Sequence, residues 1–333
     1  MVEGGRVLIL DGWRGLAVLL VLAGHFTGYY WLSGFGVELF FVLSGRLMAN
    51  VLVEQRQNLR TFVGRRVMRI LPALSVFIAI TVLVGAAADV PARELRQSAT
   101  AAALFFSNYL VGSDILTVFQ HTWSLAVEEH SYIALAAIVL LARGDPRKCG
   151  SLALGVALLM MIIAGARAIL GDEGWQLYLR SETRGASILV SFALATYARQ
   201  VANRIPPFIL QWASPTAFGA ALVLACLNLP ATIFCTIGTL CLAVSVNLVD
   251  HSHEWVGRVL RDSVLRWFGL VSFSLYLWQQ PFYAAHVTGL SATTAAPLAL
   301  LFGVASFYLV EKPARRMFRR PDAANPSRIR TAS

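Results

Sequence analysis

Long apolar runs separated by short polar stretches make up most of this 333-residue chain. Most runs approach the roughly 20 residues that a helix needs to cross the hydrocarbon core of a bilayer, which is about 30 Å thick. They lack the alternating pattern of outer-membrane barrel strands. The pattern therefore predicts an all-α, polytopic membrane protein. The runs lie at about 7–31, 34–53, 70–88, 99–118, 123–142, 150–170, 186–200, 208–228, 231–249, 267–287 and 295–310.

Basic residues indicate which runs cross the membrane and in which direction. Five arginines fall in the stretch 54–69, and a lysine and several arginines follow the last run, so both stretches are expected in the cytoplasm. With both ends of the chain on one side, the number of crossings is even. The run 99–118 is the weakest because polar residues interrupt it. We therefore predict about ten transmembrane helices, one re-entrant or surface helix near 99–118, and cytoplasmic termini. The arginines left outside are Arg93, Arg96, Arg180 and Arg184.

Composition also indicates a membrane domain rather than a large soluble core. Hydrophobic residues make up 57% of the chain and charged residues 14%, whereas soluble domains are roughly a quarter charged. The net charge of +10 lies in short loops and near the C-terminus, so it indicates topology and not a nucleic-acid partner. The four cysteines show no CxxC spacing, so no disulfide framework and no metal site is expected. We expect one membrane domain over 1–316 and a disordered cytoplasmic tail over 317–333.

Two polar residues in the first apolar run, Arg14 and His25, are the strongest candidates for function. A charged guanidinium inside a transmembrane helix is costly, so a functional role is the default interpretation. They are eleven positions apart, which is about 20° past three full helical turns, so both lie on one stripe about 16 Å apart. Asp11 lies three residues before Arg14 and is a candidate partner for its charge. Histidine is the side chain whose unperturbed pKa lies nearest neutral pH.

Three carboxylates also fall within apolar runs. Glu38 lies in the second run, and Glu128 and Glu129 lie near the start of the fifth. Because adjacent residues of a helix diverge by about 100°, we expect one of Glu128 and Glu129 to face the interior, where it would orient a histidine or bind a hydroxyl. Solvation at the membrane interface is the alternative. Trp123 and Tyr276 are candidates either for interface anchors or for substrate platforms.

Three arginines, Arg65, Arg66 and Arg69, come directly before the run 70–88. If this stretch is helical, Arg65 and Arg69 point to the same face at the membrane surface. Guanidinium groups suit the phosphates of a nucleotide-bearing donor. Contact with anionic lipid headgroups is the alternative. Arg46, at the inner end of the second run, is a further candidate for phosphate binding.

Six motifs in order resemble those of the acyltransferase-3 family of membrane acyltransferases, and together they cover about residues 8–316. Any one of them is weak, but six in the right order are specific. The first two are Leu-Asp-Gly-Trp-Arg-Gly-Leu at 10–16, followed by His25, and Gly-Val-Glu-Leu-Phe-Phe-Val-Leu-Ser-Gly at 36–45. The next two are Phe-Val-Gly-Arg-Arg-Val-Met-Arg-Ile-Leu-Pro at 62–72 and Thr-Trp-Ser-Leu-Ala-Val-Glu-Glu at 122–129 with Tyr132. The last two are Ser-Phe-Ser-Leu-Tyr-Leu-Trp at 272–278 and Glu-Lys-Pro at 311–313.

The resemblance implies transfer of an acyl group, with acetyl the expected one, from cytoplasmic acyl-CoA to a hydroxyl of a carbohydrate, a lipid-linked sugar or a small molecule. Acyl-CoA would be a co-substrate, with no tightly bound cofactor. His25 would act as the general base. Arg14 would contact a phosphate or a carbonyl, or else pair with Asp11. The other site candidates are Glu128 and Glu129 for catalysis, Arg65, Arg66, Arg69 and Arg46 for acyl-CoA, and Glu38, Ser44, Trp123, Ser124 and Tyr276 for the substrate.

The chain departs from the family pattern at a few positions. Gln279 stands where a histidine commonly follows the closing tryptophan. An amide forms hydrogen bonds but is no base, so a proton-transfer role at this position is in doubt. His130 and Ser131 replace the usual glutamine and phenylalanine after the glutamate pair.

A transporter or flippase for an acyl or glycosyl compound is the alternative function, because intramembrane Arg, Glu and His also line ion and substrate pathways. A transporter more often has two similar halves, and the sequence shows no such internal similarity. The expected location is the bacterial inner membrane, and the expected partners are the bilayer, the acyl-CoA donor and a hydroxyl-bearing acceptor. The sequence leaves open the acceptor, the acyl chain length and the oligomeric state.

Overall fold

The computed structural model describes residues 2–3, 6–110, 115–172, 174–227, 229 and 233–318, almost all of which are helical. The longer helices are α1 (Leu8–Thr27), α2 (Tyr30–Met48), α3 (Leu59–Ala87), α4 (Ala92–Ala103), α6 (Thr122–Leu141), α7 (Pro146–Ile169), α9 (Ser181–Ala202), α10 (Pro207–Cys226), α12 (Thr239–Leu248), α14 (Ser263–Val287) and α15 (Ala292–Ser306). The short ones are η1 (Ala49–Glu54), η2 (Ser107–Tyr109), α5 (Thr117–Gln120), α8 (Gly174–Leu179), η3 (Phe234–Gly238), η4 (Val249–His251), α13 (Glu254–Leu260), η5 (Phe307–Glu311) and α16 (Lys312–Phe318). Two paired strands of two residues, β1 (Val2–Glu3) and β2 (Arg6–Val7), precede α1.

The prediction of an all-α, polytopic membrane protein is confirmed. In the part of the chain that the structure describes, eight helical segments are long and apolar enough to cross a membrane. Helices α9 and α14 are equally long but less apolar, because each carries buried polar side chains. They pack lengthwise against such segments, α9 against α2 and α7, and α14 against α1 and α15. Among the described residues, these two and the eight candidate spans make ten long helical segments, and the predicted ten crossings stay a prediction.

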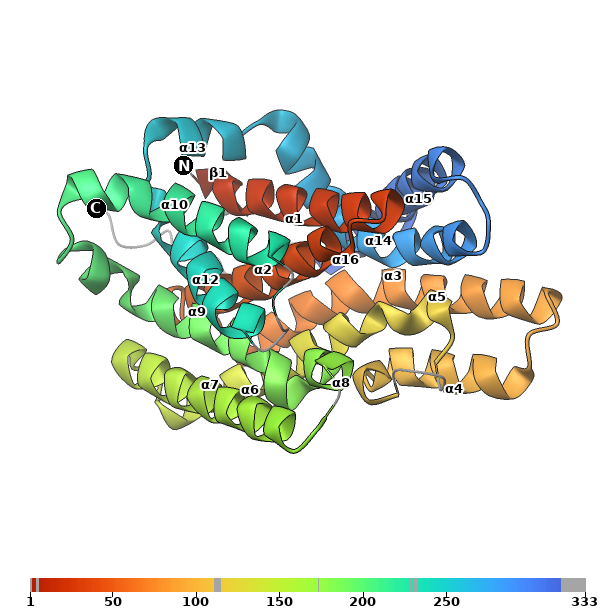
Figure 1. The fold of residues 1–333 in the computed structure, drawn as a ribbon, viewed down its shortest axis with the longest axis horizontal. Helices are drawn as coiled ribbons and strands as arrows, with labels where there is room; N and C mark the ends of the chain where they lie inside the picture. Colours follow the sequence, from red (N-terminus) through yellow and green to blue (C-terminus); the bar gives the residue numbers. More distant parts are fainter. Residues whose placement is uncertain are drawn as a thin grey trace, which may run out of the picture.

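The helix expected near 99–118 lies earlier in the chain. Helix α4 begins after Pro91 and ends at Ala103, and the chain then continues through a non-helical stretch and the short η2. The apolar pattern misplaced it because charged residues occupy its first turn. A helix of 12 residues is about 18 Å long, too short to cross the hydrocarbon core. It forms a hairpin with the end of α3 (Figure 1).

Helices from the two ends of the sequence pack together. Figure 1 shows α1 and α2 beside α14 and α15. Glycines permit the closest contact between α1 and α14: a Cβ at Gly15 would lie 1.9 Å from the Leu265 carbonyl oxygen, and one at Gly269 would lie 1.9 Å from that of Asp11. Small residues allow helix backbones to approach in this way. This contact fixes which faces of α1 and α14 meet.

The predicted cytoplasmic tail falls largely outside the described residues. Of the stretch 317–333, Met317 and Phe318 end helix α16, and residues 319–333 are outside the part that the structure describes. The disorder predicted for this stretch therefore stays a prediction.

Candidate functional site

Two neighbouring cavities lie among the central helices. The larger, here called the histidine cavity, has a volume of about 590 Å³ and is lined by His25, His121 and several aromatic side chains. The smaller, here called the arginine cavity, has a volume of about 60 Å³ and is lined by Arg14, Arg66 and Arg69 among others. Val37 and Tyr276 line both cavities, so the two spaces adjoin at these side chains.

Helix α1 carries one polar residue to each cavity. Arg14 lines the arginine cavity and His25 lines the histidine cavity, so the stripe that the sequence predicted runs along both. Arg14 Nη2 donates a hydrogen bond of 2.9 Å to Ser272 Oγ of α14. Of the two roles left open for Arg14, a contact in the cavity is the one that this position favours.

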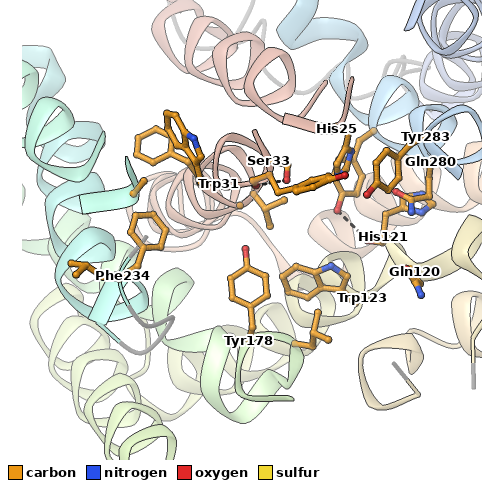
Figure 2. Close-up of a pocket in the computed structure, with 18 of the residues that line it drawn as sticks. His25, Trp31, Ser33, Gln120, His121, Trp123, Tyr178, Phe234, Gln280 and Tyr283 are labelled. Atoms are coloured by element: carbon orange, nitrogen blue, oxygen red, sulfur yellow. Dashed lines mark hydrogen bonds between the residues drawn. The ribbon is translucent and has the colours of Figure 1, made fainter. Parts of the chain in front are cut away.

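The ring of His25 is held on two sides by α14 (Figure 2). It stacks on Tyr283, with ring centroids 4.4 Å apart and planes inclined by 24°. Its Nδ1 lies 2.6 Å from Oε1 of the fully buried Gln279. Gln279 lies one helical turn before Tyr283, so a single face of α14 provides both contacts. This arrangement fixes the position and the tilt of the imidazole.

His121 is a site residue that the sequence analysis missed. It lies between α5 and α6, its side chain is 4% exposed, and it lines the histidine cavity. Neither ring nitrogen has a hydrogen-bond partner among the described residues. Its ring packs against those of Phe77 and Tyr276. Its position directly before the Thr-Trp-Ser-Leu motif was the available signal, since an intramembrane histidine is costly.

Aromatic side chains form much of the histidine cavity wall. Trp31, Trp123 and Tyr178 all line it (Figure 2), and the rings of Trp123 and Tyr178 are 5.3 Å apart. Burial raises the pKa of Tyr178, so its hydroxyl stays protonated near neutral pH. Trp123, predicted as an interface anchor or a substrate platform, lines this cavity, and its role stays a prediction.

Tyr276 and Ser124 form the boundary between the two cavities. The hydroxyls of Ser124 and Tyr276 are 2.6 Å apart, and the Tyr276 hydroxyl lies 3.1 Å from the carbonyl oxygen of His121. Ser124 lines the arginine cavity from α6, opposite α14. These bonds join α6 to α14 at the point where the cavities adjoin.

The glutamate pair of α6 meets an arginine of α3 at the arginine cavity. Arg66 donates to Glu129 Oε1 at 2.7 Å and to Glu128 Oε2 at 3.4 Å, and its guanidinium lies 3.5 Å from the centre of the Tyr132 ring. Glu128 also accepts a hydrogen bond of 2.6 Å from Ser44 Oγ. Glu128 lines the cavity and Glu129 does not, which answers the question left open by their spacing.

The other arginines of this group have different surroundings. Helix α3 begins at Leu59, so Arg65, Arg66 and Arg69 are all helical. Arg65 is exposed, whereas Arg69 is half-buried and lines the arginine cavity. Arg46 bonds to the Val246 carbonyl oxygen and to Asp250, outside the residues that line either cavity. The structure thus brings Arg14, Arg66 and Arg69 together and leaves Arg65 and Arg46 apart from them.

Glu38 belongs to a separate buried cluster. Arg184 Nη2 lies 2.5 Å from Glu38 Oε2, and both side chains are almost fully buried. Thr239 donates to the other oxygen of Glu38, and Arg184 Nη1 lies 2.7 Å from Cys235 Sγ. This cluster joins α2, α9 and η3–α12 and lines neither cavity. The expectation that Arg184 lies in an outer loop is wrong, because α9 begins at Ser181, earlier than the apolar run.

The comparison with a family model and the comparison with curated proteins agree with each other. The model of the acyltransferase-3 acyltransferase domain matches residues 7–310. A putative peptidoglycan O-acetyltransferase of Bacillus subtilis, YrhL, is 29% identical over 309 residues, covering 82% of this chain and 48% of the relative. The peptidoglycan O-acetyltransferase OatA of Listeria monocytogenes is 26% identical over 357 residues, covering 95% and 56%. A putative O-acetyltransferase of Staphylococcus aureus is 28% identical over 305 residues, covering 81% and 49%.

The chain spans about half the length of these curated relatives. No solved structure matches it.

Proposed function

The chain belongs to the acyltransferase-3 family, and from this membership we propose that it is a membrane-embedded O-acyltransferase. It would move an acyl group, with acetyl the first to test, from cytoplasmic acyl-CoA to a hydroxyl of a carbohydrate. The observation that carries the proposal is the pair of cavities that adjoin at Tyr276, one with three arginines and one with His25. Two substrates of different chemistry would each enter one cavity and react near the boundary.

The arginine cavity suits the reactive end of the donor. Its volume of about 60 Å³ would admit a small group such as an acetyl thioester but not a nucleotide. Arg66 is neutralised by its two glutamates, whereas Arg14 and Arg69 form no ion pair among the described residues. These two cations favour the polarised carbonyl or a phosphate. The nucleotide would lie outside the cavity, where Arg65 is exposed.

The histidine cavity suits a sugar. Its volume of about 590 Å³ is in the range of small-molecule sites, and it combines aromatic faces with polar groups. The faces of Trp31, Trp123 and Tyr178 would pack on the apolar side of a ring, and His121 would bond to its hydroxyls. Two of the relatives are named as peptidoglycan O-acetyltransferases, so a cell-wall glycan is the first acceptor to test.

The reaction would need one base and a polarised carbonyl. The acceptor oxygen attacks the thioester carbon, a C–O bond forms, and the C–S bond breaks. His25 takes the hydroxyl proton as the oxygen attacks, and the proton then passes to the departing thiolate. Proton transfer by a positioned side chain typically contributes about 10²–10⁴-fold. The positively charged residues of the arginine cavity would stabilise the charge that develops on the carbonyl oxygen.

Acyl transfer by the purified protein tests the proposal. The protein is placed in lipid vesicles with radiolabelled acetyl-CoA and soluble glycan fragments, and both free CoA and labelled glycan are measured. Release of CoA with labelling of the glycan supports an acyltransferase. Uptake of a compound into the vesicles without cleavage of the thioester would instead support a transporter. Placement in the bacterial inner membrane, with both termini cytoplasmic as the basic residues predict, belongs to the same proposal, since the proposed donor would be cytoplasmic.

A further inference from the structure

A chain of three hydrogen bonds ties His25 to the backbone before α6. His25 Nδ1 lies 2.6 Å from Gln279 Oε1, Gln279 Nε2 lies 3.2 Å from Gln280 Oε1, and Gln280 Nε2 lies 2.9 Å from the carbonyl oxygen of Thr117. The two glutamines are adjacent on α14, and both side chains are almost fully buried. The chain therefore connects α1, α14 and the start of α5.

The last acceptor fixes the direction of every bond in this chain. A backbone carbonyl oxygen only accepts, so the group of Gln280 that faces Thr117 is its NH₂. The oxygen of Gln280 then faces Gln279 and accepts from the NH₂ of Gln279. The oxygen of Gln279 is thereby directed at Nδ1 of His25, and an amide oxygen only accepts. Nδ1 must carry the proton for this bond to form.

We infer that Gln279 and Gln280 are positioning residues that hold neutral His25 as its Nδ1–H tautomer and leave Nε2 as the proton acceptor. The inference rests on the proposed function of His25 as the base. Which ring nitrogen of a histidine accepts a proton is set by the hydrogen bond that the other nitrogen makes. Tyr283 stacks on the ring and restrains its rotation, so the lone pair of Nε2 keeps one direction. His25 lines the histidine cavity, where the acceptor hydroxyl would lie.

Glutamine has the hydrogen-bonding groups that this role requires, and a histidine at position 279 would have them too. A neutral imidazole has one donor and one acceptor nitrogen, and a carboxamide has a donor group and an acceptor oxygen. Either side chain can accept from His25 and donate to Gln280. The position then needs a side chain that accepts at one end and donates at the other, and it needs no base.

The tautomer is measured directly on the full-length protein in lipid, with histidine labelled by nitrogen-15. The His25 signals are assigned by their loss in His25→Ala. At a pH where His25 is neutral, its Nδ1 is expected to show the chemical shift of a protonated ring nitrogen and Nε2 that of an unprotonated one. The reverse pattern would overturn the inference, whatever the enzyme assays give.

Variants then test whether the chain of hydrogen bonds through Gln279 and Gln280 controls catalysis. Gln280→Leu does not touch His25, but it removes the acceptor that orients Gln279, so mixed tautomers are expected in the nitrogen-15 spectrum. The expected fall in kcat is about 10-fold or more, part of the roughly 10²–10⁴-fold that a positioned base contributes, with little change in KM for acyl-CoA. Gln279→Leu should lower kcat at least as much, and Gln279→His should retain activity within a few-fold. Gln97→Leu, on α4 and away from both cavities, is the matched control.

The outcomes separate this inference from the proposed function. Wild-type kcat in Gln280→Leu, or equal losses in Gln279→His and Gln279→Leu, would overturn the positioning role. If His25→Ala keeps full acyl transfer, the base assignment fails even where the measured tautomer is the expected one. If no acyl transfer is found for any acceptor, the proposed function fails, and the spectrum still decides the tautomer.

Discussion

The buried pair between Glu38 and Arg184 gives the sharpest test of a structural role. Replacing Glu38 by glutamine keeps the shape but leaves the Arg184 guanidinium without its counter-charge at 1% exposure. Breaking a buried ion pair on one side costs about 3–5 kcal/mol, because the remaining charge is uncompensated. Arg184 also lies 4.4 Å from the centre of the Tyr178 ring, so the loss would reach the wall of the histidine cavity. We expect Glu38→Gln to lower the thermal unfolding midpoint in detergent by several degrees.

A double variant and a matched control complete this experiment. Glu38→Gln combined with Arg184→Met removes both charges, so it should regain most of the stability lost in the single variant. Asp250→Asn breaks another arginine–carboxylate pair, with Arg46, but Asp250 is 53% exposed, so its loss should cost no more than about 1 kcal/mol. Equal stability of Glu38→Gln and Asp250→Asn would refute the argument. Lost acceptor binding without lost stability would restore Glu38 as a substrate-binding residue.

Three further predictions follow from the site and the topology. His25→Ala should lower the acyl-transfer rate about 10²-fold or more while leaving acyl-CoA binding nearly intact, as measured by kinetics and equilibrium binding. Alanine at Arg65 should weaken acyl-CoA binding about tenfold, and added salt should weaken it in the wild type, because charged contacts to phosphate contribute roughly 1.5–3 kcal/mol. Cysteines introduced at positions 145 and 255 should resist a membrane-impermeant label in intact cells, and labelling from outside would refute the ten-crossing topology.

The sequence predicted the helical class and the shared stripe of Arg14 and His25. Both follow from the length of the apolar runs and from the number of residues per helical turn. An apolar run of suitable length forms a helix wherever it lies in the membrane. Residues eleven apart share a stripe in any helix. These inferences need no knowledge of the neighbouring helices, and the two cavities lie along that stripe.

The sequence could not predict how each helix is rotated about its own axis, and so which of its side chains face a neighbouring helix. Helical spacing suggested that Arg65 and Arg69 act together, yet Arg66 is the one that reaches the glutamates of α6, and Arg65 is exposed. The three arginines lie within one arc of about 100° on α3, so the pattern cannot tell which of them is turned toward a neighbouring helix. The choice comes from packing, such as the contact of α1 and α14 at Gly15 and Gly269.

The two least apolar long helices carry much of the polar chemistry, and this explains why hydropathy describes them poorly. Helix α14 places Ser272, Tyr276, Gln279 and Gln280 along the two cavities or in the chain of hydrogen bonds to His25. Helix α9 contributes Arg184 of the buried cluster beside them. A polar group inside a membrane is stable only when partners surround it, so both helices must lie within the bundle and not at its lipid-facing edge. Hydropathy predicts a transmembrane helix poorly where polar residues needed for function replace apolar ones. In this chain a weak hydropathy signal in a long helix therefore indicates buried polar side chains, which line the cavities on α14 and form a separate cluster on α9.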